Sequence, residues 1–227
     1  MDNRNTNYRK IKEIAAALGE LNDQVVYVGG AVVSFYADDQ AAEDQRPTRD
    51  IDIFFEIVSY GKLCNLQEKL AAKKFFPALD EDVMCRFKYN DLLVDVMSTD
   101  EVGWAMADKW FKPGLKYLTE ISIDEYKIKV LHLSYFLATK LTAFLDRKED
   151  PRTSKHFEDI VHILDNSLNL VDEILSSPED VKQYLTLEFR ELLKVEYHEA
   201  VLGHLYYETQ VERYNIIKEK LSRIINS

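Results

Sequence analysis

The chain has 227 residues, of which 46% are hydrophobic and 30% are charged, and its formal net charge is −11. These proportions are ordinary for one large or two small globular domains, and the negative charge disfavours a general nucleic-acid binder, because phosphate contacts need a basic surface. The absence of a long apolar run and of a signal-peptide pattern, with only two cysteines, predicts a reduced, cytoplasmic protein with no membrane contact.

Helical and strand patterns alternate in the first part of the chain. Apolar residues at helical spacing predict helices, and short apolar runs bounded by turn residues predict strands. In chain order the predicted elements are a helix at 8–21, a strand at 24–28, a helix at 31–37, a polar loop at 38–49, a strand at 50–57, a helix at 60–74, a hairpin at 83–98 that turns at Asn90-Asp91, and a strand at 126–133.

From Ser134 onward the periodicity is helical. Ser134 is a plausible N-cap for the helix that carries "YFLATKLTAFLDR", because its hydroxyl can accept a bond from the first helical turn. The fold class predicted is therefore α+β, with a mixed-sheet domain over residues 1–130. An all-helical domain over residues 131–227 is expected to close a cleft against it.

Two aspartates interrupt the apolar strand "DIDIFFEI". Asp is a poor strand former, and a buried carboxylate is costly unless it is paired or bound to metal. Side chains alternate along a strand, so Asp50 and Asp52 share a face and repel each other unless a cation lies between them. If the strand "DLLVDVMS" lies next to it, Asp95 completes a cup of three carboxylates. Such hard oxygen ligands suit Mg²⁺, which also binds water and substrate phosphates.

Gly29 and Gly30 stand between the first predicted strand and the helix after it. Glycines at this point let backbone N–H groups approach a phosphate. Each feature also has an ordinary explanation: D-x-D occurs by chance on exposed strands, a Gly pair is usually a turn, and Asp95 could be an ion-paired edge residue. Their order along the chain favours a nucleotide-binding metal site, because the motifs occur in the right structural context.

This order resembles the polymerase-beta-type nucleotidyltransferases, whose signature is a Gly-Gly or Gly-Ser turn, then D-x-D, then a third Asp on a later strand. The match covers residues 24–97. The resemblance implies two bound Mg²⁺ ions, with Mn²⁺ as an alternative, and an NTP as substrate. The implied metal ligands are Asp50, Asp52 and Asp95. The implied cradle for the triphosphate is Gly29 and Gly30.

The second half resembles the AbiEii/AbiGii-type nucleotidyltransferases, which include toxins of bacterial toxin–antitoxin and phage-defence systems. In that family one helix carries K-L-x-A-x-x-x-R and a later helix carries R-D-x-x-D. The segment "KLTAFLDR" matches the first motif through Lys140 and Arg147, and "KHFED" matches the second at Asp159. Lys155 and His156 stand where the family has Arg and Asp, which argues against a catalytic role for position 156.

A triphosphate needs a cation besides the metal ions once three carboxylates are counted. Lys140 and Arg147 share a helical face with a small residue between them, and lysine suits phosphate as a point charge. We therefore expect Lys140, oriented by Asp159, to face the carboxylates and bind the phosphates with Arg147. Arg49 is the nearest cation in the first half. The ordinary alternative is a lysine and an arginine that extend from the helix into solvent.

These features predict a metal-dependent nucleotidyltransferase that moves an NMP from an NTP to an acceptor hydroxyl and releases pyrophosphate. The acceptor stays open among a tRNA end, a protein side chain and a small-molecule hydroxyl. An aminoglycoside-type acceptor is one alternative, because an acidic surface suits a polycation. A non-catalytic nucleotide- or protein-binding module on the same fold is another. The resemblance to toxins also implies a cognate antitoxin as a protein partner.

Overall fold

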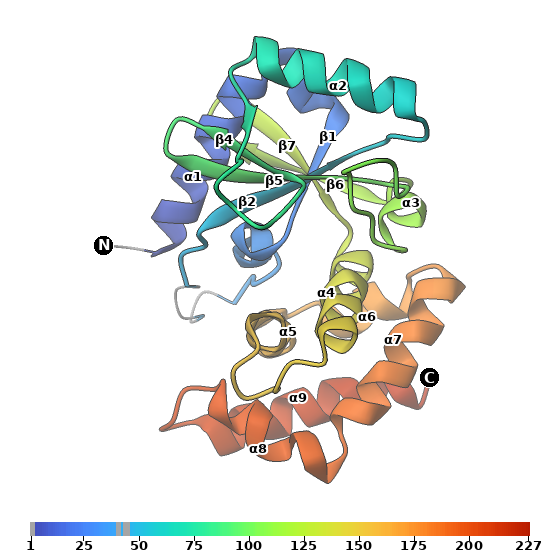
Figure 1. Cartoon of the computed structure of the whole chain (residues 1–227). Coiled ribbons are helices and arrows are strands. Elements are labelled where there is room, and N and C mark those ends of the chain that lie inside the picture. The colour runs from blue at the N-terminus through green and yellow to red at the C-terminus, as the bar shows by residue number, and fades with distance from the viewer. Residues whose placement is uncertain (1–2, 40–41, 43–45) are drawn as a thin grey trace. The chain divides into compact units, whose positions relative to one another are not determined.

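The computed structural model describes residues 3–39, 42 and 46–227, so part of the predicted loop at 38–49 lies outside the described residues. The chain divides into two compact units (Figure 1). The first contains the described residues up to Ser34 and those from 46 to His132. The second contains Leu133–Ser227 and the described residues between 35 and 43. In this short segment Tyr36 stacks on Phe136, with ring centroids 4.4 Å apart.

A mixed β-sheet forms the centre of the first unit (Figure 1). Within the described residues it has seven strands in the order β3-β4-β5-β2-β1-β7-β6. The strands are β1 (Val25–Val28), β2 (Asp50–Phe55), β3 (Phe76–Pro77), β4 (Arg86–Tyr89), β5 (Leu92–Ser98), β6 (Leu118–Ile123) and β7 (Tyr126–Leu131). Strand β2 pairs antiparallel with β1 and parallel with β5. The predicted α+β class is therefore confirmed.

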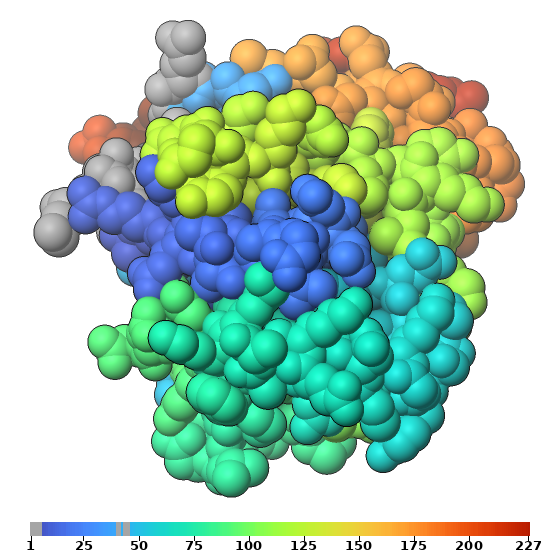
Figure 2. All heavy atoms as spheres, turned by 90° about the horizontal axis from the view of Figure 1, so that it is seen from above, coloured from blue at the N-terminus to red at the C-terminus, as the bar shows by residue number. Residues whose placement is uncertain are grey.

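Two long helices accompany the sheet. They are α1 (Asn3–Leu18) and α2 (Tyr60–Ala72), with the shorter elements η1 (Gly19–Gln24), η2 (Gly30–Phe35) and α3 (Phe111–Gly114). The apolar positions that predicted the first helix, Ile11, Ile14 and Leu18, are fully buried. Figure 2 shows α1 (dark blue) beside the β6–β7 hairpin (yellow-green), where Lys12 Nζ lies 2.7 Å from Asp124 Oδ2.

The second unit is helical. Its helices are α4 (Leu133–Arg147), α5 (Lys155–Asn166), α6 (Leu170–Leu175), α7 (Glu179–Leu192), α8 (Val195–Gly203) and α9 (Gln210–Ile225). The last helix buries Ile217, Leu221 and Ile224 on one stripe. No helix in the described part of the chain is long and apolar enough to cross a membrane.

The local predictions need two corrections. The predicted helix at 31–37 is the six-residue 3-10 helix η2, in which Val32 and Val33 are fully buried; β-branched side chains are less suited to a regular α-helix. Ser134 is not an N-cap, because α4 begins at Leu133, directly after β7. Strand β6 was missed because only one of its six side chains is buried and its apolar signal is weak.

Candidate active site

Three aspartates lie on one face of the sheet. In the β2–β5 register Asp52 is directly opposite Asp95, and Asp50 lies two residues before Asp52. Residues directly opposite each other in adjacent strands point to the same face. The alternate residues Ile51 and Ile53 point to the other face and are buried. Burial of these isoleucines therefore maintains the register that gathers the three carboxylates.

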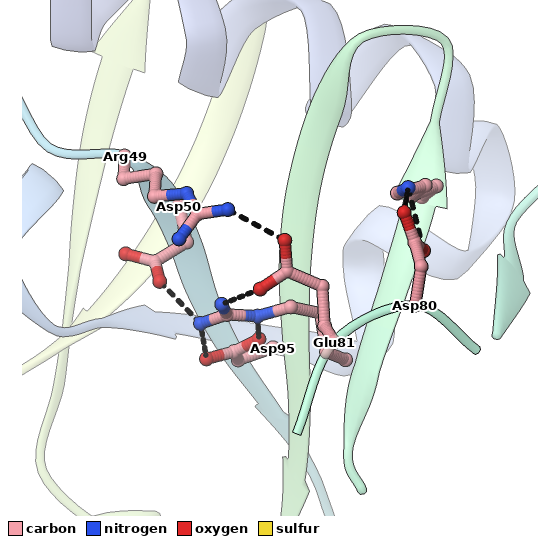
Figure 3. Close-up of polar contacts among 7 residues, drawn as sticks. Arg49, Asp50, Asp80, Glu81 and Asp95 are labelled. Carbon is pink, nitrogen blue, oxygen red and sulfur yellow. Dashed lines mark hydrogen bonds and ion pairs between the residues drawn. The ribbon is translucent and has the colours of Figure 1, made fainter. Parts of the chain in front are cut away.

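The cation among these carboxylates is the guanidinium of Arg86 (Figure 3). Its Nε and Nη2 donate to the two carboxylate oxygens of Asp95 at 2.7 and 2.8 Å, and Nη2 also donates to Asp50 Oδ2 at 2.5 Å. Nη1 donates to Glu81 Oε2 at 3.1 Å. Hydrogen bonding to Asp95 raises the pKa of Arg86 further above its usual value, although partial burial opposes this. The guanidinium is therefore permanently charged.

Arg49 extends this ionic network toward solvent. Its Nη2 lies 2.5 Å from Glu81 Oε1, and its side chain is 68% exposed. Glu81 thus accepts hydrogen bonds from two arginines, Arg49 and Arg86 (Figure 3). The predicted contact of Arg49 with a triphosphate stays a prediction.

Sequence reasoning missed Arg86 and Glu81. A signal for Arg86 was present, because a hairpin with a two-residue turn at Asn90-Asp91 fixes the register of its strands. In that register Arg86 is directly opposite Asp95. No comparable signal marks Glu81, which precedes β4 in an irregular segment.

The donor set has the right chemistry for Mg²⁺, because carboxylate oxygens on one face are the ligands this ion prefers. The arrangement in the structure is different from an open metal site. Within the described residues, no group of three or more His, Cys, Asp or Glu side chains is placed so that it could hold a metal ion. Arg86 contacts both oxygens of Asp95 and one of Asp50. The metal-binding role of Asp50, Asp52 and Asp95 therefore stays a prediction.

Gly29 lies against the Asp52 carboxylate. Its φ is +73°, and a Cβ added to it would lie 1.7 Å from Asp52 Oδ2. Gly29 therefore meets two requirements, a left-handed backbone and close approach to a carboxylate, that other residues cannot meet. Gly30 begins η2, a six-residue helix. The structure thus places the glycine pair beside the aspartates, and the phosphate cradle stays a prediction.

A cavity of about 610 Å³ lies at the other end of β1 and β2, against α2. Three lysines line part of it: Lys62, Lys69 and Lys129. None of the residues predicted to be functional is part of its lining.

A second ionic cluster lies inside the helical unit. Lys140 on α4 and Asp159 on α5 form an ion pair of 2.7 Å, and their side chains are only 5% and 2% exposed. The Lys140 ammonium also lies 5.4 Å from the centroid of the Phe136 ring. Arg147, on the same helix, is 62% exposed and lies 3.8 Å from Glu149. The structure thus brings Lys140 and Asp159 together and leaves Arg147 in solvent.

His156 belongs to the same helical unit and is partly buried. Burial, and to a smaller extent the positive charges of Lys140 and Arg147, together lower its pKa to about 4. Its Nδ1 is a buried nitrogen without a hydrogen-bond partner among the described residues. The imidazole is therefore neutral at neutral pH, with an acceptor or donor position available.

The conformation of Gly29 leads to a stability prediction. We expect Gly29→Ala to lower the free energy of unfolding by at least about 1–2 kcal/mol, because a left-handed backbone is strained in alanine and the new methyl group would displace Asp52. Gly61→Ala is the matched control, because Gly61 lies in α2 and an added Cβ meets nothing within 4 Å. Urea unfolding of both variants is the measurement. Equal stability of the two would contradict the observed packing.

The lowered pKa of His156 leads to a pH prediction. In the unfolded chain the imidazole takes up a proton near pH 6.5, whereas in the folded protein it does so only near pH 4. Its contribution to stability is complete above pH 6.5, falls as the pH drops, and is lost below about pH 4. Between pH 7 and 5 we expect wild type to lose roughly 2 kcal/mol more unfolding free energy than His156→Gln.

The control for this measurement is His198→Gln, on α8, whose side chain is 40% exposed. It should follow wild type over the same pH range in urea unfolding. A parallel loss of stability in wild type and His156→Gln would show that the folded protein does not disfavour protonation of His156.

Two solved structures are similar to this chain. An antigenic nucleotidyltransferase-like protein from Paracoccidioides brasiliensis superposes with a TM-score of 0.51 at 14% identity, over 88% of this chain and 93% of that chain. The antibiotic-resistance factor ANT(2'')-Ia superposes with a TM-score of 0.48 at 18% identity, over 84% of this chain and 98% of that chain. At these identities the first likeness shows a common fold only.

No curated protein matches the chain. A family model described as nucleotidyl transferase AbiEii toxin, type IV TA system, matches residues 14–200. That match includes the three aspartates, the glycine pair and the Lys140–Asp159 pair. The chain therefore belongs to the AbiEii nucleotidyl transferase family.

Proposed function

We propose that the protein transfers an NMP from an NTP to an acceptor hydroxyl and releases pyrophosphate, with divalent metal ions bound at the carboxylates of the sheet. The observation that carries this proposal is the register that gathers Asp50, Asp52 and Asp95 on one face, with Gly29 against Asp52. Three carboxylates on one face carry more negative charge than the single guanidinium of Arg86 offsets. A site for cations and phosphates accounts for them.

The candidate site residues of the first unit have distinct roles in this proposal. Asp50, Asp52 and Asp95 would hold the ions, Mg²⁺ or Mn²⁺, which when bound neutralise charge on the attacking and leaving oxygens. Gly29 leaves room for a phosphate to approach the backbone. Arg49, exposed beside the carboxylates, would attract the triphosphate. The protein itself mainly supplies position and fixed charge, as is usual in phosphoryl transfer.

The partners follow from the family and the charge. The family is described as a toxin of type IV toxin–antitoxin systems, so we propose toxin activity and a cognate antitoxin. The acceptor hydroxyl belongs to a tRNA end, a protein side chain or a small molecule. The net charge of −11 favours a cationic acceptor, such as an aminoglycoside, over a long RNA footprint.

A second candidate function is a non-catalytic module that binds a nucleotide or a protein. It is favoured by the guanidinium of Arg86, which binds the carboxylates of Asp50 and Asp95. It is also favoured by His156, which stands where the family motif has Asp. Incubation with each α-³²P-labelled NTP and total RNA, protein or small-molecule pools separates the two. Metal-dependent label in one pool supports the transferase. Nucleotide binding without label in any pool supports the module.

The aspartates allow a direct test of metal-dependent transfer. We expect Asp52→Asn to abolish label transfer, at least about 100-fold, because the amide keeps the shape of the side chain and loses its charge. Its thermal stability should be unchanged or higher, since carboxylate repulsion is relieved. Asp91→Asn, exposed at the hairpin turn, is the matched control and should keep full activity. An unfolded Asp52→Asn would show a structural role instead.

A test of Lys140 has to separate the structural role of its ion pair with Asp159 from a role in binding the NTP phosphates. Lys140→Ala removes the cation that is paired with the buried Asp159 carboxylate, so we expect unfolding free energy to fall by about 3–5 kcal/mol. Lys148→Ala, exposed just after α4, should change it by less than about 0.5 kcal/mol. Both values come from urea unfolding.

The double variant Lys140→Met/Asp159→Leu removes both charges and should recover most of that stability. If Lys140 binds the phosphates, this stable double variant should still bind NTP at least roughly 10-fold more weakly than wild type in the presence of Mg²⁺. Wild-type affinity in a folded double variant would show that the pair has a structural role only.

A further inference from the structure

Arg86 occupies the position of a bridging cation. Its Nη2 lies 2.5 Å from Asp50 Oδ2 and 2.8 Å from Asp95 Oδ2, so one nitrogen joins a carboxylate of β2 to a carboxylate of β5 (Figure 3). A divalent ion held by Asp50 and Asp95 would have to share them with Arg86, which binds both oxygens of Asp95 and one of Asp50. The guanidinium and the ion would therefore compete for these carboxylates.

The contacts of Arg86 differ in how firmly they hold it. Asp95 is bound twice, through Nε and Nη2, in the bidentate geometry that is strongest for arginine and carboxylate. Asp50 is bound through a single nitrogen. Glu81 accepts from Nη1 at 3.1 Å and so provides another anionic partner away from β2. The Asp50 contact can be given up while the guanidinium stays charged, paired and bound to Asp95.

We propose that Arg86 is a positioning residue that acts as an internal counter-ion: it neutralises the metal-free carboxylates and competes with the divalent ion for Asp50. This inference rests on the metal site of the proposed function. Its consequence is that metal binding is weakened by the competition and is coupled to a shift of the guanidinium toward Asp95 and Glu81. The affinity for the metal ion then depends on other ligands that the ion can bind. The phosphates of an NTP are ligands of this kind.

Metal affinity in the absence of nucleotide tests the competition directly. Mn²⁺ titration, followed by the electron paramagnetic resonance signal of the free ion, gives the dissociation constant of the full-length protein without any activity assay. We expect Arg86→Gln to bind Mn²⁺ about 10-fold more tightly than wild type, because the competitor is removed and the cluster becomes more negative. Thermal unfolding should show a lower Tm in EDTA and a larger increase on addition of Mn²⁺.

Arg49→Gln is the matched control. It removes the same charge from the same network, but Arg49 contacts Glu81 and leaves the oxygens of Asp50 and Asp95 untouched. Its Mn²⁺ affinity should rise by less than about 3-fold, as expected for the loss of a screened, exposed charge. An equal gain in both variants would overturn competition in favour of general electrostatics. Unchanged or weaker binding by Arg86→Gln would overturn it in favour of a purely orienting role.

Arg86→Lys covers the case in which Arg86→Gln does not fold. Lysine keeps the charge but cannot bind Asp95 and Asp50 through a planar fork, so its Mn²⁺ affinity should lie between wild type and Arg86→Gln, and affinity equal to wild type would contradict the proposal. Failure of this proposal leaves metal-dependent label transfer by wild type intact. Failure of the proposed function instead removes that transfer, whatever the Mn²⁺ affinities are.

Discussion

Repulsion between carboxylates on one face of the central sheet is the constraint on which the rest of the first unit depends. Asp50, Asp52 and Asp95 share that face because β2 and β5 are parallel and in register. Like charges at such separations raise the free energy of the folded state unless a cation lies among them. In the structure that cation is Arg86, delivered by the neighbouring strand β4. The sheet thus carries both the repelling carboxylates and the guanidinium that neutralises part of their charge.

Burial of apolar side chains on the other face of the same strands offsets the free-energy cost of gathering the carboxylates. Ile51, Ile53 and Phe55 alternate with the aspartates along β2, so they point to the other face, where all three are buried. Each fully buried side chain of this size contributes about 1.5–3 kcal/mol relative to an exposed one. Burial on one face therefore offsets the cost of charge on the other, and it also prevents a one-residue slip that would exchange the two faces.

The two ionic clusters differ in their freedom to exchange partners. Lys140 and Asp159 are both almost completely buried, and removing one charge of such a pair is strongly destabilising. Arg86 is shared among three carboxylates of which Asp50 is 27% exposed. A guanidinium that has several carboxylate partners, one of them partly exposed, can redistribute its hydrogen bonds at lower cost than a lysine in a fully buried pair. The first cluster is suited to a changing charge state and the second to a fixed one.

Much of this arrangement could be predicted from the sequence, and the failures have identifiable causes. The D-x-D strand and the Asn90-Asp91 hairpin follow from local alternation and turn chemistry, so β2, β4 and β5 were predicted correctly. The ion pairs depend on where separate segments meet. Glu81 reaches Arg86 from an irregular segment that carries no periodic signal. The burial of Lys140 also escaped prediction, because α4 is covered on several sides and helical periodicity alone does not reveal this.

The parallel pairing of β2 with β5 also bears on when the site comes into existence during folding. Parallel strands need a long crossover connection, and here it includes α2, β3 and β4. Closing such a connection costs conformational entropy before any ladder bond repays it. Asp52 and Asp95 therefore meet only after the centre of the sheet has formed. A chain still emerging from the ribosome without β5 has the glycine pair and D-x-D but no assembled cluster, so the three carboxylates can come together only after Leu92–Ser98 has been synthesised.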